Sequence, residues 1–257
     1  MQDKKKYIIV FIILGIYVIG VFLLFGKDIM KSKMYTSYLM VSPTTRWKFV
    51  KGHWSDAGKV SDYSLKPFEV YVGNKKFGTY NLTYNDKFYL FDNDRNPQLY
   101  DGNLIAYWGS LSMEVIDFQS EKVTQSDAPI IQKVLKENKL NISLDKLNMW
   151  KVEIDIDNDG KKEILYAVDN LFKENGETSA IAFLFILDDG KITYLHKKIE
   201  SNKSTYSLCS PYVSNIIDID KDKQYEIIMG CVYYSDRGTC HNLFDNKKNK
   251  YELLKGC

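Results

Sequence analysis

The chain has 257 residues, a formal net charge of +2, and almost equal numbers of basic and acidic side chains, 35 and 33. Only three of its basic residues are arginines, so it lacks the cluster of guanidinium groups typical of phosphate or base recognition. We therefore expect no nucleic-acid partner. The length is enough for one or two hydrophobic cores.

The chain begins with a segment that has the features of a membrane anchor. Tyr7–Gly26 is twenty residues long and carries no charge, which is enough to span a hydrocarbon core of about 30 Å. A cleavable signal peptide is the alternative, but its apolar core is usually shorter, and no small-residue cleavage site follows Phe25. We therefore expect residues 1–30 to be a short cytoplasmic tail and an uncleaved transmembrane helix.

Residues 44–126 are predicted to form an antiparallel β module. Short alternating or apolar segments recur between turns rich in Gly, Asn and Asp, as in antiparallel strands. Their aromatic side chains either form a carbohydrate- or peptide-binding face or, more usually, pack in the core. The expected strands are Trp47–Val50, His53–Trp54, Phe68–Val72, Phe77–Tyr84, Lys87–Phe91, Leu104–Trp108 and Met113–Phe118.

A short helix and a linker are predicted over residues 127–149. Asp127 suits the N-cap position, and Pro129 follows in the first turn. Before Asn138, apolar residues recur at helical spacing and form a stripe that would pack against the β structure. The stripe consists of Ile130, Ile131, Val134 and Leu135.

Residues 150–257 are predicted to form two units of four strands, each a meander that contains one acidic loop and Asp/Gly turns. Such a unit cannot bury both of its faces alone, and two units are too few to close a propeller. We therefore expect two stacked sheets. The strands are Lys151–Ile154, Glu163–Asp169, Ala180–Leu187 and Lys191–Ile199, then one strand that follows Cys209, Glu226–Tyr234, Thr239–Phe244 and Tyr251–Lys255.

The acidic loops, Asp155–Glu163 and Asp218–Glu226, both carry acids at positions 1, 3, 5 and 9. Carboxylates at alternate positions can turn toward one point, and the carbonyl of residue 7 with the acid at 9 can complete the oxygen shell that Ca²⁺ prefers. A polar turn rich in Asp is the alternative. The predicted ligands are Asp155, Asp157, Asp159, the Lys161 carbonyl and Glu163, and then Asp218, Asp220, Asp222, the Gln224 carbonyl and Glu226.

The loops are not those of an EF-hand, because position 12 holds Tyr166 or Met229 instead of an acid, and the flanking segments alternate as strands do. They resemble the calcium loops of FG-GAP/VCBS repeats, the blade units of integrin-type β-propellers. The resemblance covers Trp150–Cys257 and implies two blade-like, calcium-binding sheets. The second loop departs from the pattern at Lys223, which stands where the first loop has a turn glycine.

All four cysteines lie within the last 49 residues, and four cysteines allow three pairings. The expected meander places Cys209 beside Cys231 and brings Cys240 to the same edge as Cys257, so we favour these two disulfides. The rival arrangement joins Cys231 to Cys240 and leaves Cys209 for Cys257. Four reduced thiols are another alternative, and a metal site at Cys240 and His241 is a third.

Sequence signatures of common catalytic sites are missing: there is no G-x-S-x-G, no H-E-x-x-H, no P-loop and no Rossmann glycine pattern. The sequence therefore does not predict an enzyme. Calcium loops and clustered cysteines suit the extracytoplasmic side of a cell membrane, because cytosolic calcium is scarce and cytosolic thiols stay reduced.

The pattern favours a single-pass, membrane-anchored and calcium-stabilised module of the cell envelope. Its role is either to bind an envelope protein or glycan or to be structural, and the membrane contact is Tyr7–Gly26. A membrane-bound hydrolase accessory subunit and an extracellular sensor remain the alternatives. The sequence does not identify a ligand for any of these three hypotheses.

Overall fold

A computed structural model describes residues 36–41, 45–50, 53–58, 66–85, 88–91, 104–110, 112–170, 180–200, 208–233, 239–246 and 250–256. Within these ranges the protein is mainly β, with antiparallel sheets and one short α-helix, which confirms the predicted class. The predicted transmembrane segment, Tyr7–Gly26, lies outside the described residues. Among the residues described, no helix is both long enough and apolar enough to cross a membrane.

The N-terminal sheet has seven strands in the order β3-β2-β1-β7-β4-β5-β6. The interior strand β1, which pairs with β2 and β7, was not predicted, and it begins before the expected module start at residue 44. Five of its six residues are buried, so the segment lacks the alternation that marks a half-buried strand. The strands are β1 (Thr36–Val41), β2 (Thr45–Val50), β3 (His53–Asp56), β4 (Pro67–Val72), β5 (Lys75–Asn85), β6 (Phe88–Phe91) and β7 (Leu104–Trp108).

Each C-terminal unit is a four-stranded meander, as predicted, with a fifth strand added beside its first strand. The first repeat sheet has the order β13-β12-β11-β10-β9, and the second repeat sheet has the order β17-β16-β15-β14-β8. The meander strands are β10 (Asn148–Ile154), β11 (Glu163–Asn170), β12 (Ala180–Asp188), β13 (Lys191–Glu200), β14 (Cys209–Asp218), β15 (Glu226–Tyr233), β16 (Thr239–Asn246) and β17 (Tyr251–Lys255).

The two added strands correct the expected extent of the 44–126 module. The strand expected over Met113–Phe118 does not join the N-terminal sheet. Instead, β8 (Glu114–Ile116) pairs with β14, and β9 (Ser120–Lys122) pairs with β10. The first strand of a meander leaves one edge unpaired, and a neighbouring segment can cover it. One connecting segment therefore ties the two repeat sheets together.

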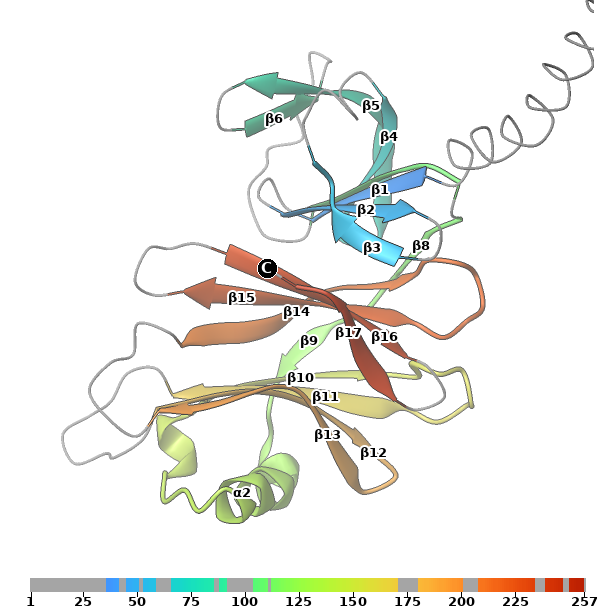
Figure 1. Cartoon of the computed structure of the whole chain (residues 1–257). Helices are drawn as coiled ribbons and strands as arrows, with labels where there is room; N and C mark the ends of the chain where they lie inside the picture. The colour runs from blue at the N-terminus through green and yellow to red at the C-terminus, as the bar shows by residue number, and fades with distance from the viewer. Residues whose placement is uncertain are drawn as a thin grey trace, which may run out of the picture.

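The sheets stack as layers, with α2 (Ala128–Glu137) on the outer face of the first repeat sheet (Figure 1). Along β11, Leu165 packs in the core between the repeat sheets, whereas Tyr166 packs in the core beneath α2. Along β15, Ile227 faces the same inter-sheet core, and Ile228 packs in the core shared with the N-terminal sheet. Burial on both faces explains why these strands are continuous apolar runs.

The helix α2 starts after Asp127 and ends before Asn138, as predicted, and a proline lies in its first turn. The Asp127 side chain makes no capping bond to α2. Instead its carboxylate accepts hydrogen bonds from the Thr124 N–H and the Tyr166 hydroxyl, both at 2.8 Å, and lies 3.4 Å from the Lys151 ammonium. Burial acts to raise the pKa of Asp127, but these partners outweigh it and lower that pKa.

A disulfide joins Cys209 in β14 to Cys231 in β15, with their Cα atoms 5.3 Å apart. This confirms the first predicted pair and rules out the rival bond between Cys231 and Cys240, although those two residues are register partners. Cys240 is also disulfide-bonded. Its expected partner, Cys257, lies outside the described residues, so that pair stays a prediction.

Removing the Cys209–Cys231 bond is expected to lower the free energy of unfolding by about 3 kcal/mol. The bond closes a loop with a sequence separation of 22, which restricts the unfolded chain. Urea unfolding of the Cys209→Ala/Cys231→Ala variant measures the loss. A stability equal to that of the wild type would contradict a structural role for the bond.

Candidate calcium centres

The two acidic loops occupy equivalent places, each between the first and second strand of its meander, β10 and β11 or β14 and β15. Position 2 is an isoleucine in both, and Ile156 and Ile219 are only 0 % and 6 % exposed. Because alternate residues of an extended segment face opposite ways, burial of position 2 turns positions 1 and 3 toward the loop interior. The core thus helps to orient the first two candidate ligands.

Both loops are held by the same four hydrogen bonds from backbone N–H groups. The N–H of position 2 donates to the position-9 glutamate, at 2.7 Å in the first loop and 2.9 Å in the second. The N–H of position 6 donates to the position-1 aspartate, at 3.0 and 3.2 Å. The N–H of position 5 donates to the position-3 aspartate, and the N–H of position 7 to the position-5 aspartate. The two loops therefore share one conformation.

Positions 4 and 6 have a left-handed backbone in both loops. In the first loop φ is 59° at Asn158 and 91° at Gly160, and in the second it is 64° at Lys221 and 66° at Lys223. Lys223, which departs from the glycine pattern, therefore follows the same path as Gly160. A left-handed lysine costs about 1–2 kcal/mol, so the loop structure around it must enforce that path.

The loops bring most of their predicted ligands together. Asp159 is exposed and lies outside the first cluster, and Glu226 is buried and lies outside the second. Lys161 and Gln224, predicted as carbonyl ligands, each donate their N–H to the position-5 aspartate. The carboxylate oxygens that lie within 4.8 Å of one another belong to Asp155, Asp157 and Glu163, and to Asp218, Asp220 and Asp222.

Burial and the charges of neighbouring acids raise the pKa values of the position-3 aspartate and the position-9 glutamate in both loops. Burial, together with the nearby Asp157 and Asp155, raises the pKa of Glu163 to about 7. Burial raises the pKa of Glu226 to about 9, and the nearby Asp220 adds to the shift. A cation would offset this repulsion and favour the ionised carboxylates.

Asp188 and Asp245 are further acids that the loop pattern did not predict. Each lies in the third meander strand, where the antiparallel register continues to the position-9 glutamate of its own loop. Their negative charges contribute to the raised pKa values of Glu163 and Glu226, respectively. Only an alignment of the two meanders beyond the loops, with the strand register known, would have identified Asp188 and Asp245.

Asp218 supplies a buried acceptor without a protein partner. Its side chain is only 3 % exposed, and Oδ2 accepts the Lys223 N–H at 3.2 Å. Among the residues described, Oδ1 has no hydrogen-bond partner. A buried carboxylate oxygen is costly to leave unpaired, and a hard cation is a partner suited to an oxygen-lined loop. The residues present therefore fit Ca²⁺.

The loops lie side by side at one end of the stacked sheets. The Tyr225 N–H, at position 8 of the second loop, donates to the Ile156 carbonyl of the first at 2.9 Å. Burial raises the pKa of the Tyr225 hydroxyl, and the charges of Asp218 and Asp155 add to the shift. This tyrosine therefore lies close to both loops, and its backbone connects them.

A third group of potential metal ligands consists of His196, Cys209 and Cys231. The two cysteines form a disulfide, so they offer no thiolate to a metal. His241 is fully buried, and its Nδ1 lies 2.9 Å from the Thr45 hydroxyl of the N-terminal sheet. The Nε2 atoms of both histidines are buried.

Without calcium, the stability contributed by Glu163 and Glu226 is expected to fall as pH rises. Their folded-state pKa values are about 7 and about 9, whereas the ordinary value is 4.5. Between 4.5 and those values the folded state binds more protons than the unfolded chain, so this contribution is complete below 4.5 and is lost as pH rises.

Thermal melts in EDTA from about pH 5 to about pH 9 test this pH dependence. The Glu163→Gln/Glu226→Gln variant, which does not titrate at these positions, separates the glutamates from the histidines. We expect the wild type to lose more stability than the variant across this range. Equal slopes would show that the glutamates are not protonated in the folded protein.

Comparisons of this chain with family models, with curated proteins and with solved structures found no match. The interpretation of the two loops therefore depends on their own geometry: a duplicated set of backbone hydrogen bonds, converging carboxylates and one buried oxygen that lacks a protein partner.

Proposed function

We propose that this chain is a single-pass membrane protein whose extracytoplasmic part is a binding or structural module of the cell envelope, stabilised by Ca²⁺. The observation that carries the calcium proposal is the duplicated loop. Both copies share one backbone frame, and in both the carboxylates at positions 1 and 3 converge with a third acid, which is Glu163 in the first loop and Asp222 in the second. The unpartnered Asp218 Oδ1 is independent support for a cation in the second loop.

Calcium would supply positive charge to two groups of carboxylates that otherwise repel one another. In the first loop the ligands are Asp155, Asp157, Asp159, the Lys161 carbonyl and Glu163. The second loop offers Asp218, Asp220, Asp222, the Gln224 carbonyl and Glu226. Because each loop joins two core strands, an ion bound there would stabilise the sheet that follows it. The meander topology and the shared loop frame support the proposed kinship with FG-GAP/VCBS repeats.

Two arguments support an extracytoplasmic location for the two meanders. The Cys209–Cys231 disulfide is typical of an oxidising compartment, which the cytosol is not. Extracytoplasmic calcium is also abundant enough to fill loops of moderate affinity. The anchor Tyr7–Gly26 would then hold the sheets close to the membrane, with an envelope protein or glycan as partner.

Protease added to intact spheroplasts is expected to digest nearly all of the protein beyond Met30. The apolar span is long and lacks a processing site, so the chain should remain anchored with its β domain exposed to the medium. Immunoblotting of the C-terminal region follows the digestion, and a cytoplasmic protein serves as the integrity control. Full protection of the C-terminal region would contradict the proposed orientation.

A further inference from the structure

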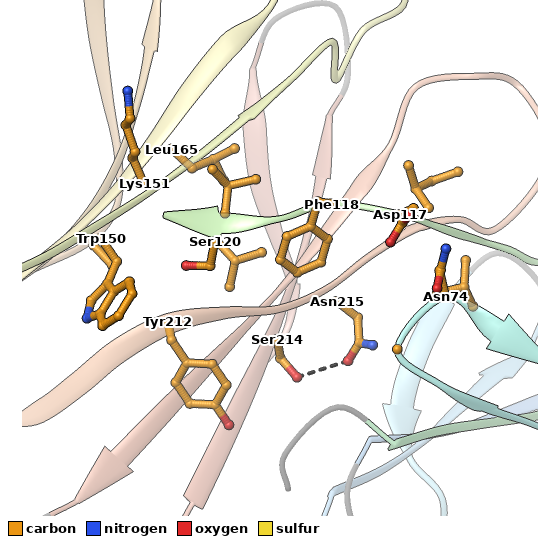
Figure 2. A pocket seen from close by; sticks show the side chains of 16 residues that line it. Asn74, Asp117, Phe118, Ser120, Trp150, Lys151, Leu165, Tyr212, Ser214 and Asn215 are labelled. Atoms are coloured by element: carbon orange, nitrogen blue, oxygen red, sulfur yellow. Dashed lines mark hydrogen bonds between the residues drawn. The ribbon is translucent and has the colours of Figure 1, made fainter. Parts of the chain in front are cut away.

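A pocket of about 430 Å³ opens where the edges of the two repeat sheets meet. This volume lies within the range of about 300–1,000 Å³ that is usual for small-molecule sites. Its lining includes Ser120 and Trp150 from β9 and β10, and Tyr212 and Asn215 from β14 (Figure 2). Phe118, from the segment that connects the sheets, also lines the pocket. Both repeats therefore contribute to the pocket.

The pocket exists because β8 covers only part of the β14 edge. β8 pairs with residues 216–218, so within the described ranges the earlier part of β14 pairs with β15 alone. An open edge can accept an added peptide strand, but Pro211 has no N–H to offer, and a bulge between Val213 and Asn215 interrupts the ladder. A ligand here is therefore recognised mainly by side chains.

The bulge places Ser214 and Asn215 in the pocket wall, although their side chains are only 1 % and 2 % exposed. The Ser214 hydroxyl donates to Asn215 Oδ1 at 2.9 Å. This bond fixes the orientation of the Asn215 amide, so that its Nδ2 points away from Ser214. In the part of the chain described, neither Asn215 Nδ2 nor the Tyr212 hydroxyl has a hydrogen-bond partner. The wall thus offers an oriented neutral donor and a free hydroxyl.

Charge around the pocket is nearly balanced. The Lys151 side chain points away from the other labelled residues in Figure 2, and its ammonium pairs with Glu153 at 2.6 Å. Among the described residues, Asp117 is the other charged side chain of the lining, and the ammonium of Lys122 lies 5.8 Å from the centre of the Trp150 ring. One acid and one base do not create a field that selects ions of either sign.

We propose that this pocket binds uncharged sugar units of a glycan. Trp150, which is 44 % exposed, and Tyr212 offer flat apolar faces that suit the C–H face of a sugar ring. The Asn215 amide, the Ser120 hydroxyl and the Tyr212 hydroxyl are neutral partners for sugar hydroxyls. The inference rests on the proposed envelope function and narrows its ligand to a neutral glycan.

Isothermal titration of the full chain in detergent micelles tests the proposal with two probes, the β-1,4-linked trisaccharides of glucose and of N-acetylglucosamine. We expect saturable binding of at least one probe, weakened about tenfold or more in Trp150→Ala because an aromatic anchor is lost. Tyr212→Phe should weaken binding less. Phe77→Ala removes an aromatic that is 46 % exposed and lies outside the pocket lining, so it should bind as the wild type does.

Absence of saturable binding by either trisaccharide, or equal affinities of the wild type and Trp150→Ala, would overturn the proposal. Tighter binding of an acidic trigalacturonate or of an aromatic tripeptide would overturn it too, by assigning the pocket to an anion or a peptide. Melting with and without calcium is recorded on the same samples. Lost sugar binding with an intact calcium response contradicts only the ligand class, whereas a missing calcium response contradicts the proposed function.

Discussion

Saturating calcium is expected to raise the free energy of unfolding by about 2.7 kcal/mol for each loop when free calcium is a hundredfold above the dissociation constant. The two loops together therefore give the largest effect that we expect. The physical reason is the removal of repulsion among carboxylates that the backbone hydrogen bonds hold close together. Thermal melts in EDTA and in calcium measure the gain.

Single substitutions measure how much each loop contributes to the calcium-dependent gain in the free energy of unfolding. Asp157→Ala should remove the share of the first loop. Asp220→Ala should remove a smaller share, because the second loop carries a positively charged lysine, Lys223, where the first has Gly160. Asp189→Ala is a matched control, since this exposed acid pairs with Lys161 and belongs to neither cluster. If calcium did not change the melting temperature of the wild type, both loops would be Asp-rich turns that bind no calcium.

Ile156→Ala is expected to lower the free energy of unfolding by about 2–5 kcal/mol, although it removes no candidate ligand. The Ile156 side chain is 0 % exposed and belongs to the core between the two repeat sheets. Truncation leaves a cavity in that core and loosens the segment that orients Asp155 and Asp157. Urea unfolding in EDTA isolates the packing effect from calcium binding.

The equivalent variant Ile219→Ala should lose stability through a different core, the one shared with the N-terminal sheet. Val72→Ala, at a position that is 42 % exposed, is the control and should change stability by less than about 0.5 kcal/mol. If Ile156→Ala were as harmless as Val72→Ala, the first loop would not be anchored in the core.

Elements with local signals were predictable from the sequence. The helix Ala128–Glu137 has an N-terminal aspartate, an early proline and an apolar stripe, and the meander strands lie between Asp/Gly turns. The strand β9 has no such signal, because its three residues, Ser-Glu-Lys, are all exposed. Its existence depends on the open edge of β10, and the sheet that β8 joins depends on β14, far along the chain.

The candidate sites, too, were predictable from the sequence only where their signals are local. The loop ligands follow from spacing within nine residues, so the sequence was sufficient to propose them. Asp188 and Asp245 come to the loops through strand register, and the left-handed path of Lys223 depends on the frame around it. The pocket beside Trp150 is formed by two sheet edges and a bulge. No sequence pattern predicts that these three features lie together.

Counting the calcium ions bound by the full chain in detergent tests the two-loop proposal most directly. Equilibrium dialysis should find two ions for each wild-type chain, one for Asp157→Ala, one for Asp220→Ala, and none for the double variant. Asp189→Ala should still bind two. A wild-type chain that binds no calcium, or a count that neither loop substitution changes, would contradict the assignment of the loops as calcium sites.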